Sequence, residues 1–136
     1  MKAEGTFEVV STTPTELVPP MEQIEVGLPV GVMTFVKEYA GKVEGRSATV
    51  FVAAYDMASG VGSYVAMESF EGSLAGTEGG FVYTHAATTT GGGREAEFFT
   101  IVPGSGSGAL ATIRGGGGMA IEDDGTHRIW FDYDLG

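Results

Sequence analysis

The sequence predicts an all-β protein whose strands close into a single antiparallel up-and-down barrel. With 136 residues the chain is long enough for one domain with its own core, so residues 1–136 are expected to form that domain. The 23 glycines fall mostly between runs rich in Val, Phe, Tyr, Ala and Thr, which is typical of short strands joined by tight turns. No segment shows a sustained apolar period of 3.6 residues, so no long helix is expected.

Eight strands are expected, and nearly all of them are joined by short hairpins with Gly-rich or Asp-rich turns. Pro14 and the spacing of Thr13 and Glu16 predict one helical turn after the first strand, and three prolines make 17–29 irregular. Closure of eight strands into a barrel would remove exposed edges and leave a lumen that is filled or holds one small ligand. The expected strands are 3–11, 30–42, 47–56, 61–74, 79–88, 94–102, 108–122 and 128–135.

The composition limits the partners of this chain. Eighteen acidic and seven basic side chains give a formal net charge of −11, so neither nucleic acid nor an anionic membrane surface is an expected partner. Cysteine is absent, which excludes disulfides and thiolate metal ligands. The first residues lack the apolar core of a signal peptide, and no run approaches ~18 apolar residues, so a cytoplasmic protein is expected.

Four segments of the sequence together resemble a known bacterial family. They are Gly45-Arg-Ser-Ala-Thr49, Tyr64-Val-Ala-Met-Glu-Ser-Phe-Glu-Gly72, Val102-Pro-Gly-Ser-Gly-Ser-Gly-Ala-Leu110 and Asp124-Gly-Thr-His-Arg-Ile-Trp-Phe-Asp-Tyr-Asp-Leu135. This combination resembles a domain-of-unknown-function family of small proteins with a fold similar to allene oxide cyclase. The resemblance implies a calycin-like eight-stranded barrel, related also to dirigent proteins and often homo-oligomeric. It implies no activity, and the chain departs from the family pattern at Thr112 and in the unbroken run Gly115–Gly118.

The hairpin of 61–74 and 79–88 contains the only plausible pairing of an acidic side chain with a histidine. A two-residue turn at Gly76-Thr77 would place Glu68 opposite His85. Because side chains alternate between the two faces of a strand, Glu68 and His85 would share one face with aromatic rings. A one-residue slip in the strand register would move this whole set of side chains to the opposite face. A two-residue turn at Ser59-Gly60 would add rings from the preceding strand. The expected ligand-binding rings are Phe51, Tyr55, Tyr64, Phe70, Tyr83 and Phe99.

Glu68 and His85 are the candidate catalytic residues. Burial would raise the pKa of Glu68 and a charged His85 would lower it, and either state suits proton transfer with an apolar substrate. The alternative is a surface cross-strand pair or a satisfied core pair. Two ligands are too few for a metal site, and the Gly104–Ala109 match to a dinucleotide pattern precedes a strand, so neither metal nor cofactor is expected.

Two functions remain open from the sequence. The first is a barrel that binds a small hydrophobic molecule and cyclises or isomerises it, with Glu68 and His85 as acid/base groups. The second is a carrier or structural module without chemistry, whose lumen is filled by side chains. Whether the protein is an enzyme is therefore left open.

Overall fold

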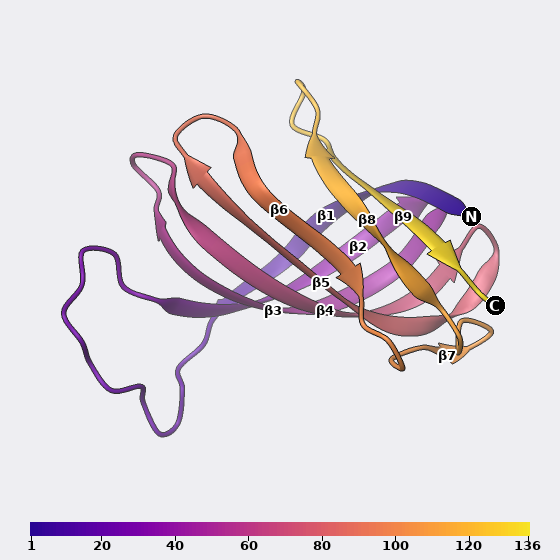
Figure 1. Cartoon of the computed structure of the whole chain (residues 1–136), viewed down its shortest axis with the longest axis horizontal. Helices are drawn as coiled ribbons and strands as arrows, with labels where there is room; N and C mark the ends of the chain where they lie inside the picture. The colour runs from indigo at the N-terminus through magenta and orange to yellow at the C-terminus, as the bar shows by residue number, and fades with distance from the viewer.

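The computed structural model describes all residues 1–136 and contains nine β-strands and no helix, which confirms the all-β prediction. The strands form one antiparallel sheet that closes in a ring (Figure 1). They are β1 (Lys2–Pro14), β2 (Gly31–Gly41), β3 (Val43–Asp56), β4 (Val61–Leu74), β5 (Thr77–Thr90), β6 (Arg94–Ile101), β7 (Ser107–Gly108), β8 (Arg114–Ile121) and β9 (His127–Asp134). The chain has no helix of the length and apolar character needed to cross a membrane.

The ring is uneven. Around it the order is β1, β2, β3, β4, β5, β6, β8, β9 and again β1, while the two-residue β7 pairs only with the start of β5. Strands β3, β4 and β5 have 14 residues each, whereas β6, β8 and β9 have eight. The β6–β8 contact has a single register pair, Thr100 with Gly116, so this is the loosest seam of the ring.

Two local predictions were wrong. The helical turn expected near Pro14 is absent, because β1 continues to Pro14 and pairs there with Met33. The expected strand 108–122 is interrupted by turns between β7 and β8. In this interruption the Leu110 amide donates to the Ser107 carbonyl at 3.0 Å, and the Leu110 side chain is completely buried. The apolar side chains thus plug the end of the ring instead of continuing a strand.

The core fills the end of the ring at which both chain termini lie (Figure 1). Strand β5 shows the period of two that produces this core: its alternate residues from Phe81 to Ala87 are buried, and the residues between them are half-exposed. Fourteen buried side chains form one cluster. They are Ala3, Phe7, Tyr39, Val43, Phe70, Leu74, Phe81, Tyr83, Ile101, Leu110, Ile113, Ile129, Phe131 and Tyr133.

A row of glycines crosses neighbouring strands within this filled end. Gly45 lies opposite Gly72, Gly72 opposite Gly79, and Gly79 opposite Gly108. Gly45 and Gly72 have φ angles of +140° and +153°, and a Cβ on either would overlap the backbone of the other strand. Glycine therefore permits a backbone approach that no other residue allows at these two positions.

Replacing Gly72 by alanine should destabilise the fold, because the new Cβ meets the β3 backbone and the positive φ is strained. We expect a loss of about 1–3 kcal/mol in the free energy of unfolding, measured by urea denaturation. Gly92→Ala is the matched control, since Gly92 has open space around it and no strained φ. Equal stability of the two variants would show that the glycine row does not constrain the ring.

Candidate functional site

The central hairpin has a different register from the predicted one. Its turn is Ala75-Gly76, so Glu68 lies opposite Tyr83 and His85 opposite Ala66. The turn between β3 and β4 is also longer than predicted, because pairing resumes only at Asp56 and Val61. In each hairpin the observed cross-strand partner lies two residues away from the predicted one. Since side chains alternate with a period of two, an even shift preserves the face, and Glu68 and His85 both point inward.

One oxygen of the Glu68 carboxylate accepts hydrogen bonds from three hydroxyl groups. The Oε1 atom receives them from Ser47 Oγ at 2.9 Å, Thr49 Oγ1 at 2.9 Å and Tyr39 OH at 3.1 Å. Tyr39 comes from β2, and Ser47 and Thr49 are alternate inward residues of β3. Tyr39 OH also lies 2.6 Å from Tyr83 OH. These hydroxyls leave Oε1 without access to solvent or to a ligand.

The second carboxylate oxygen binds two nitrogen atoms. Lys37 Nζ donates to Glu68 Oε2 at 2.7 Å, and His85 Nε2 lies 2.5 Å from the same oxygen. The Lys37 ammonium also lies 4.5 Å from the centre of the Phe7 ring, a cation–π contact that helps to compensate its burial. Glu68 is 0% exposed. It is therefore a buried ion with all of its lone-pair directions occupied.

The network controls which groups are charged. Burial alone would raise the pKa of Glu68, but the hydrogen bond from His85 and the charge of Lys37 outweigh burial and hold this pKa well below its ordinary value. Burial lowers the pKa of Lys37, and Glu68 opposes that shift. Burial, reinforced by the negative charge of Glu68, raises the pKa values of Tyr39 and Tyr83. Glu68 is thus held as a carboxylate at neutral pH.

His85 connects the buried carboxylate to a tyrosine. An ionised Glu68 can only accept a hydrogen bond, so His85 Nε2 carries the hydrogen. In the neutral form of the imidazole Nδ1 is then an acceptor, and Tyr64 OH, 3.0 Å away, is placed to donate to it. Burial raises the pKa of Tyr64, and the charge of Arg94 partly opposes this shift. A hydrogen-bond chain thus runs from Glu68 through His85 to the Tyr64 hydroxyl.

This chain ends at a cavity of about 200 Å³ lined by β4, β5, β6 and β8. The cavity lies at the loose β6–β8 seam, because residues of both β6 and β8 line it. Arg94 is held in this wall by the Met119 carbonyl at 2.7 Å and by Glu97 Oε1 at 3.1 Å. The lining residues are Tyr64, His85, Ala86, Arg94, Glu97, Phe98, Phe99, Gly117, Gly118 and Met119.

The expected ligand-binding rings divide between three environments. Tyr64 and Phe99 line the cavity, and Phe51 stacks on Tyr64 with ring centres 5.2 Å apart. Phe70 and Tyr83 belong to the filled core instead, where they are shielded from any ligand. Tyr55 is 44% exposed at the end of β3, next to Gly62 of the paired strand. The structure therefore brings only part of the expected set to one site.

Sequence reasoning missed Lys37, Tyr39 and Arg94. Lys37 and Tyr39 belong to β2, where they are the two buried alternate residues, and this period of two is the signal that could have placed them on the face of Glu68. Arg94 is the first residue of β6 and pairs with Thr89. No group of three His, Cys, Asp or Glu side chains is placed to hold a metal ion.

Glu68→Gln should destabilise the protein by about 3–5 kcal/mol at pH 7, because it leaves the Lys37 ammonium buried without a counter-charge. The lowered pKa of Glu68 stabilises the fold above the ordinary carboxyl value of 4.5, and this stabilisation is lost as the pH falls below that value. Urea denaturation from pH 7 to pH 3 should therefore show a flatter acid limb in the variant. Glu71→Gln removes an exposed ion pair with Arg46 and serves as the control. An unchanged acid limb in Glu68→Gln would contradict this role.

Comparison with known proteins agrees with the sequence resemblance in part. A family model described as a protein of unknown function (DUF3224) matches residues 3–133. A crystal structure of a DUF3224-family protein of unknown function from Shewanella oneidensis MR-1 has 30% sequence identity and a TM-score of 0.82, with coverage of 100% of this chain and 98% of that chain. No curated protein matches the chain. Neither match relates it to allene oxide cyclases, so that likeness stays a prediction. The chain belongs to the DUF3224 family.

Proposed function

We propose that the protein binds a small, mostly apolar molecule in the cavity at the β6–β8 seam and exchanges a proton with it, as an isomerase or cyclase would. The observation that carries this proposal is the hydrogen-bond chain from Glu68 through His85 to Tyr64, which ends at the cavity. In this function Tyr64 and His85 are the catalytic residues. Glu68 is a positioning residue, since its oxygens are occupied within the protein.

The proton balance of such a step is simple. The Tyr64 oxygen takes a proton from a carbon of the ligand while the Tyr64 hydroxyl proton moves to His85 Nδ1, which gives an imidazolium next to the Glu68 carboxylate. The carboxylate stabilises that cation, as an ion pair of low solvent access does. In the second half of the cycle Tyr64 gives its proton to another atom of the ligand while His85 Nδ1 returns a proton to the Tyr64 oxygen, which completes the isomerisation and restores neutral His85. The protein is unchanged over the cycle.

The dimensions and lining of the cavity restrict the ligand. A volume of about 200 Å³ is smaller than the ~300–1,000 Å³ of typical drug-sized sites, which favours a compact molecule. Phe98, Phe99 and Met119 offer apolar contacts, whereas Tyr64 and His85 offer hydrogen bonds to a carbonyl or hydroxyl group. A small carbonyl compound with an acidic C–H bond fits both requirements.

We further propose that the ring works as an eight-stranded up-and-down barrel, with β7 as an addition to its filled end. One end is closed by the core, and the ligand enters through the loose seam. The similarity to allene oxide cyclase supports cyclase chemistry only as an analogy between folds, because unrelated functions use the same fold.

A carrier or structural module without chemistry is the second candidate. The observation that favours it is the complete occupation of Glu68 by donors from the protein, which is also what a structural buried ion pair requires. The filled core also favours this candidate, because side chains occupy one half of the lumen. The two candidates differ in whether a bound ligand exchanges a proton with the protein.

Binding should depend on the open space beside Met119. A library of small carbonyl compounds, screened by ligand-observed NMR, should contain compounds that bind the wild-type protein and bind at least about tenfold more weakly to Met119→Trp. Met57→Trp is the matched control, since Met57 is 87% exposed in the turn between β3 and β4. If Met119→Trp binds as the wild type does, the ligand site lies elsewhere.

Proton exchange should depend on Tyr64. In heavy water the wild-type protein should catalyse deuterium incorporation at the carbon next to the carbonyl of a bound compound, followed by proton NMR. Tyr64→Phe should bind the same compound but lose ~10²–10⁴-fold of the exchange rate, because the hydroxyl that transfers the proton is absent. Binding without exchange in the wild type would support the carrier instead. Exchange that persists in Tyr64→Phe would exclude the proposed relay.

A further inference from the structure

The outer surface of β2–β6 carries a largely apolar patch that includes some Thr and Ser residues but no charged side chain. Three rows of outward residues cross these strands in register, and four of their side chains, Val50, Val65, Met67 and Phe98, are 50–54% exposed. We call these rows the outer apolar face. The rows are Val32, Val52, Val65, Ala86 and Phe98; Thr34, Val50, Met67, Thr84 and Thr100; and Val36, Ala48, Ser69 and Val82.

Charged residues begin immediately beyond the outer apolar face. On one side the next row contains Glu38, Arg46 and Glu71, and on the other side Glu95 pairs with Thr88. The chain as a whole has a formal net charge of −11. Two copies that met through most of their surfaces would bring carboxylates together, which costs free energy. At the outer apolar face they can meet without that repulsion.

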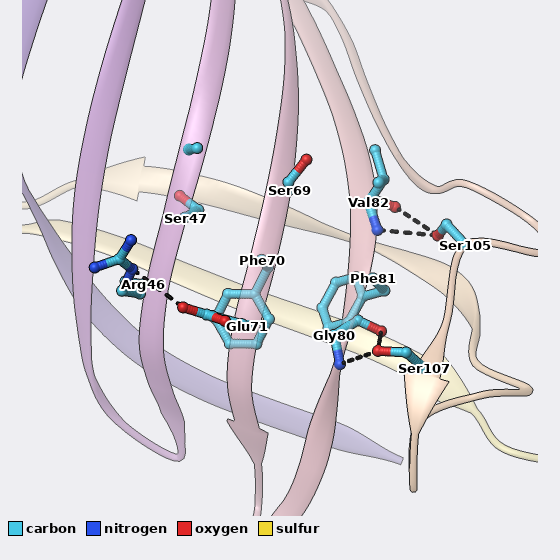
Figure 2. A pocket seen from close by; sticks show the side chains of 11 residues that line it. Arg46, Ser47, Ser69, Phe70, Glu71, Gly80, Phe81, Val82, Ser105 and Ser107 are labelled. Atoms are coloured by element: carbon cyan, nitrogen blue, oxygen red, sulfur yellow. Dashed lines mark hydrogen bonds and ion pairs between the residues drawn. The ribbon is translucent and has the colours of Figure 1, made fainter.

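The outer apolar face deepens into a groove along one margin. This groove of about 410 Å³ lies between the Arg46–Glu71 ion pair and Ser105 and Ser107, with Val82 in its lining (Figure 2). Ser105 Oγ accepts a hydrogen bond from the Val82 amide at 2.9 Å, which holds the segment after β6 against β5. One wall of the groove is therefore held in place by this hydrogen bond, and the groove forms a concave margin of the outer apolar face.

A second unpartnered apolar element is the connection between β1 and β2. Residues 15–30, here called the arm, project from the end of the ring opposite the chain termini (Figure 1). The backbone hydrogen bond from the Thr15 amide to the Val32 carbonyl, at 3.0 Å, joins the arm to the ring at its first residue only. Its aliphatic side chains are exposed, Val18 at 92% and Ile24 at 75%. The other exposed aliphatic residues of the arm are Leu17, Met21, Val26 and Val30.

We propose that the outer apolar face and the arm together form a twofold interface with a second copy of this chain, in which each arm lies on the partner's face. Five strands ~4.8 Å apart, four of them with three outward residues and β6 with two, span an area of roughly 400 Å². A stable interface buries about 800 Å² on each partner, so the face alone is too small. The arm supplies additional apolar surface. In a twofold arrangement each arm covers the outer apolar face of the other copy, so both arms and both faces are buried.

The electrostatics of this dimer have a definite sign. The outer apolar face is uncharged, the arm carries Glu16, Glu22 and Glu25, and the two copies are both strongly acidic, so the long-range interaction between them is repulsive. Salt screens repulsion between exposed charges. The dissociation constant should therefore decrease, by at least about threefold, when NaCl is raised from 50 to 500 mM. An interface held by ion pairs would weaken under the same change.

Sedimentation velocity of the full chain over 1–200 μM tests the dimer. We expect a dimer for the wild type, and monomers for Met67→Glu and for the triple variant Val18→Ser, Met21→Ser and Ile24→Ser. Ile121→Glu is the matched control, because Ile121 is 62% exposed but lies outside the outer apolar face and the arm, and this variant should stay dimeric. Thermal melting and circular dichroism of each variant check that the fold is intact.

Three results would overturn the proposal. They are a wild type that stays monomeric at 200 μM, a dimer that survives Met67→Glu, and an equal loss of the dimer in Ile121→Glu. Should the serine variant dimerise as the wild type does, the assignment of the arm is wrong. Cosedimentation of a monomeric wild type with phosphatidylcholine vesicles would assign the face to a lipid surface instead.

Discussion

The buried carboxylate of Glu68 is the constraint on which the centre of this structure depends. An ion removed from water requires compensating charge and hydrogen bonds, and here Glu68 of β4 receives its donors from three other strands, β2, β3 and β5. Lys37 cannot be buried without Glu68, and Glu68 cannot remain ionised without its donors. The register of four strands is therefore coupled to one side chain, in addition to their backbone hydrogen bonds.

The network divides the ring into two functional halves. Toward the chain termini the lumen is closed by the apolar core, the glycine row and the plug around Leu110. On the other side His85 and Tyr64 lead from the buried ion to the cavity at the β6–β8 seam. A rigid polar centre of this kind positions an imidazole better than a mobile surface pair does, because the tautomer and the ring orientation are both determined by Glu68. The loosest part of the sheet is thus adjacent to its most constrained side chains.

The distribution of charge outside the ring has a separate consequence. The chain carries 18 acidic and seven basic side chains, while the outer apolar face and the arm lack a covering element of their own. Placing the proposed contact on β2–β6 keeps it away from the chain termini. The cavity and this face share only the neighbourhood of Ala86 and Phe98, which line both. A second copy would therefore alter the entrance of the cavity without contacting Glu68.

The sequence by itself determined the fold class, most strand positions and the fact that Glu68 and His85 share one face, whereas it left open whether that face points into the ring. Strand 61–74 matches β4 at both ends, and both turn errors preserved the face because they shifted the register by two residues. Only the tertiary structure decided what surrounds that pair. Lys37 and Tyr39 approach from a strand that is not adjacent to the hairpin, and a local period carries no information on which strands meet or how deeply they are buried. The same limit explains the interrupted strand 108–122 and the division of the aromatic rings: alternation is encoded locally, whereas closure of the ring is a property of the whole chain.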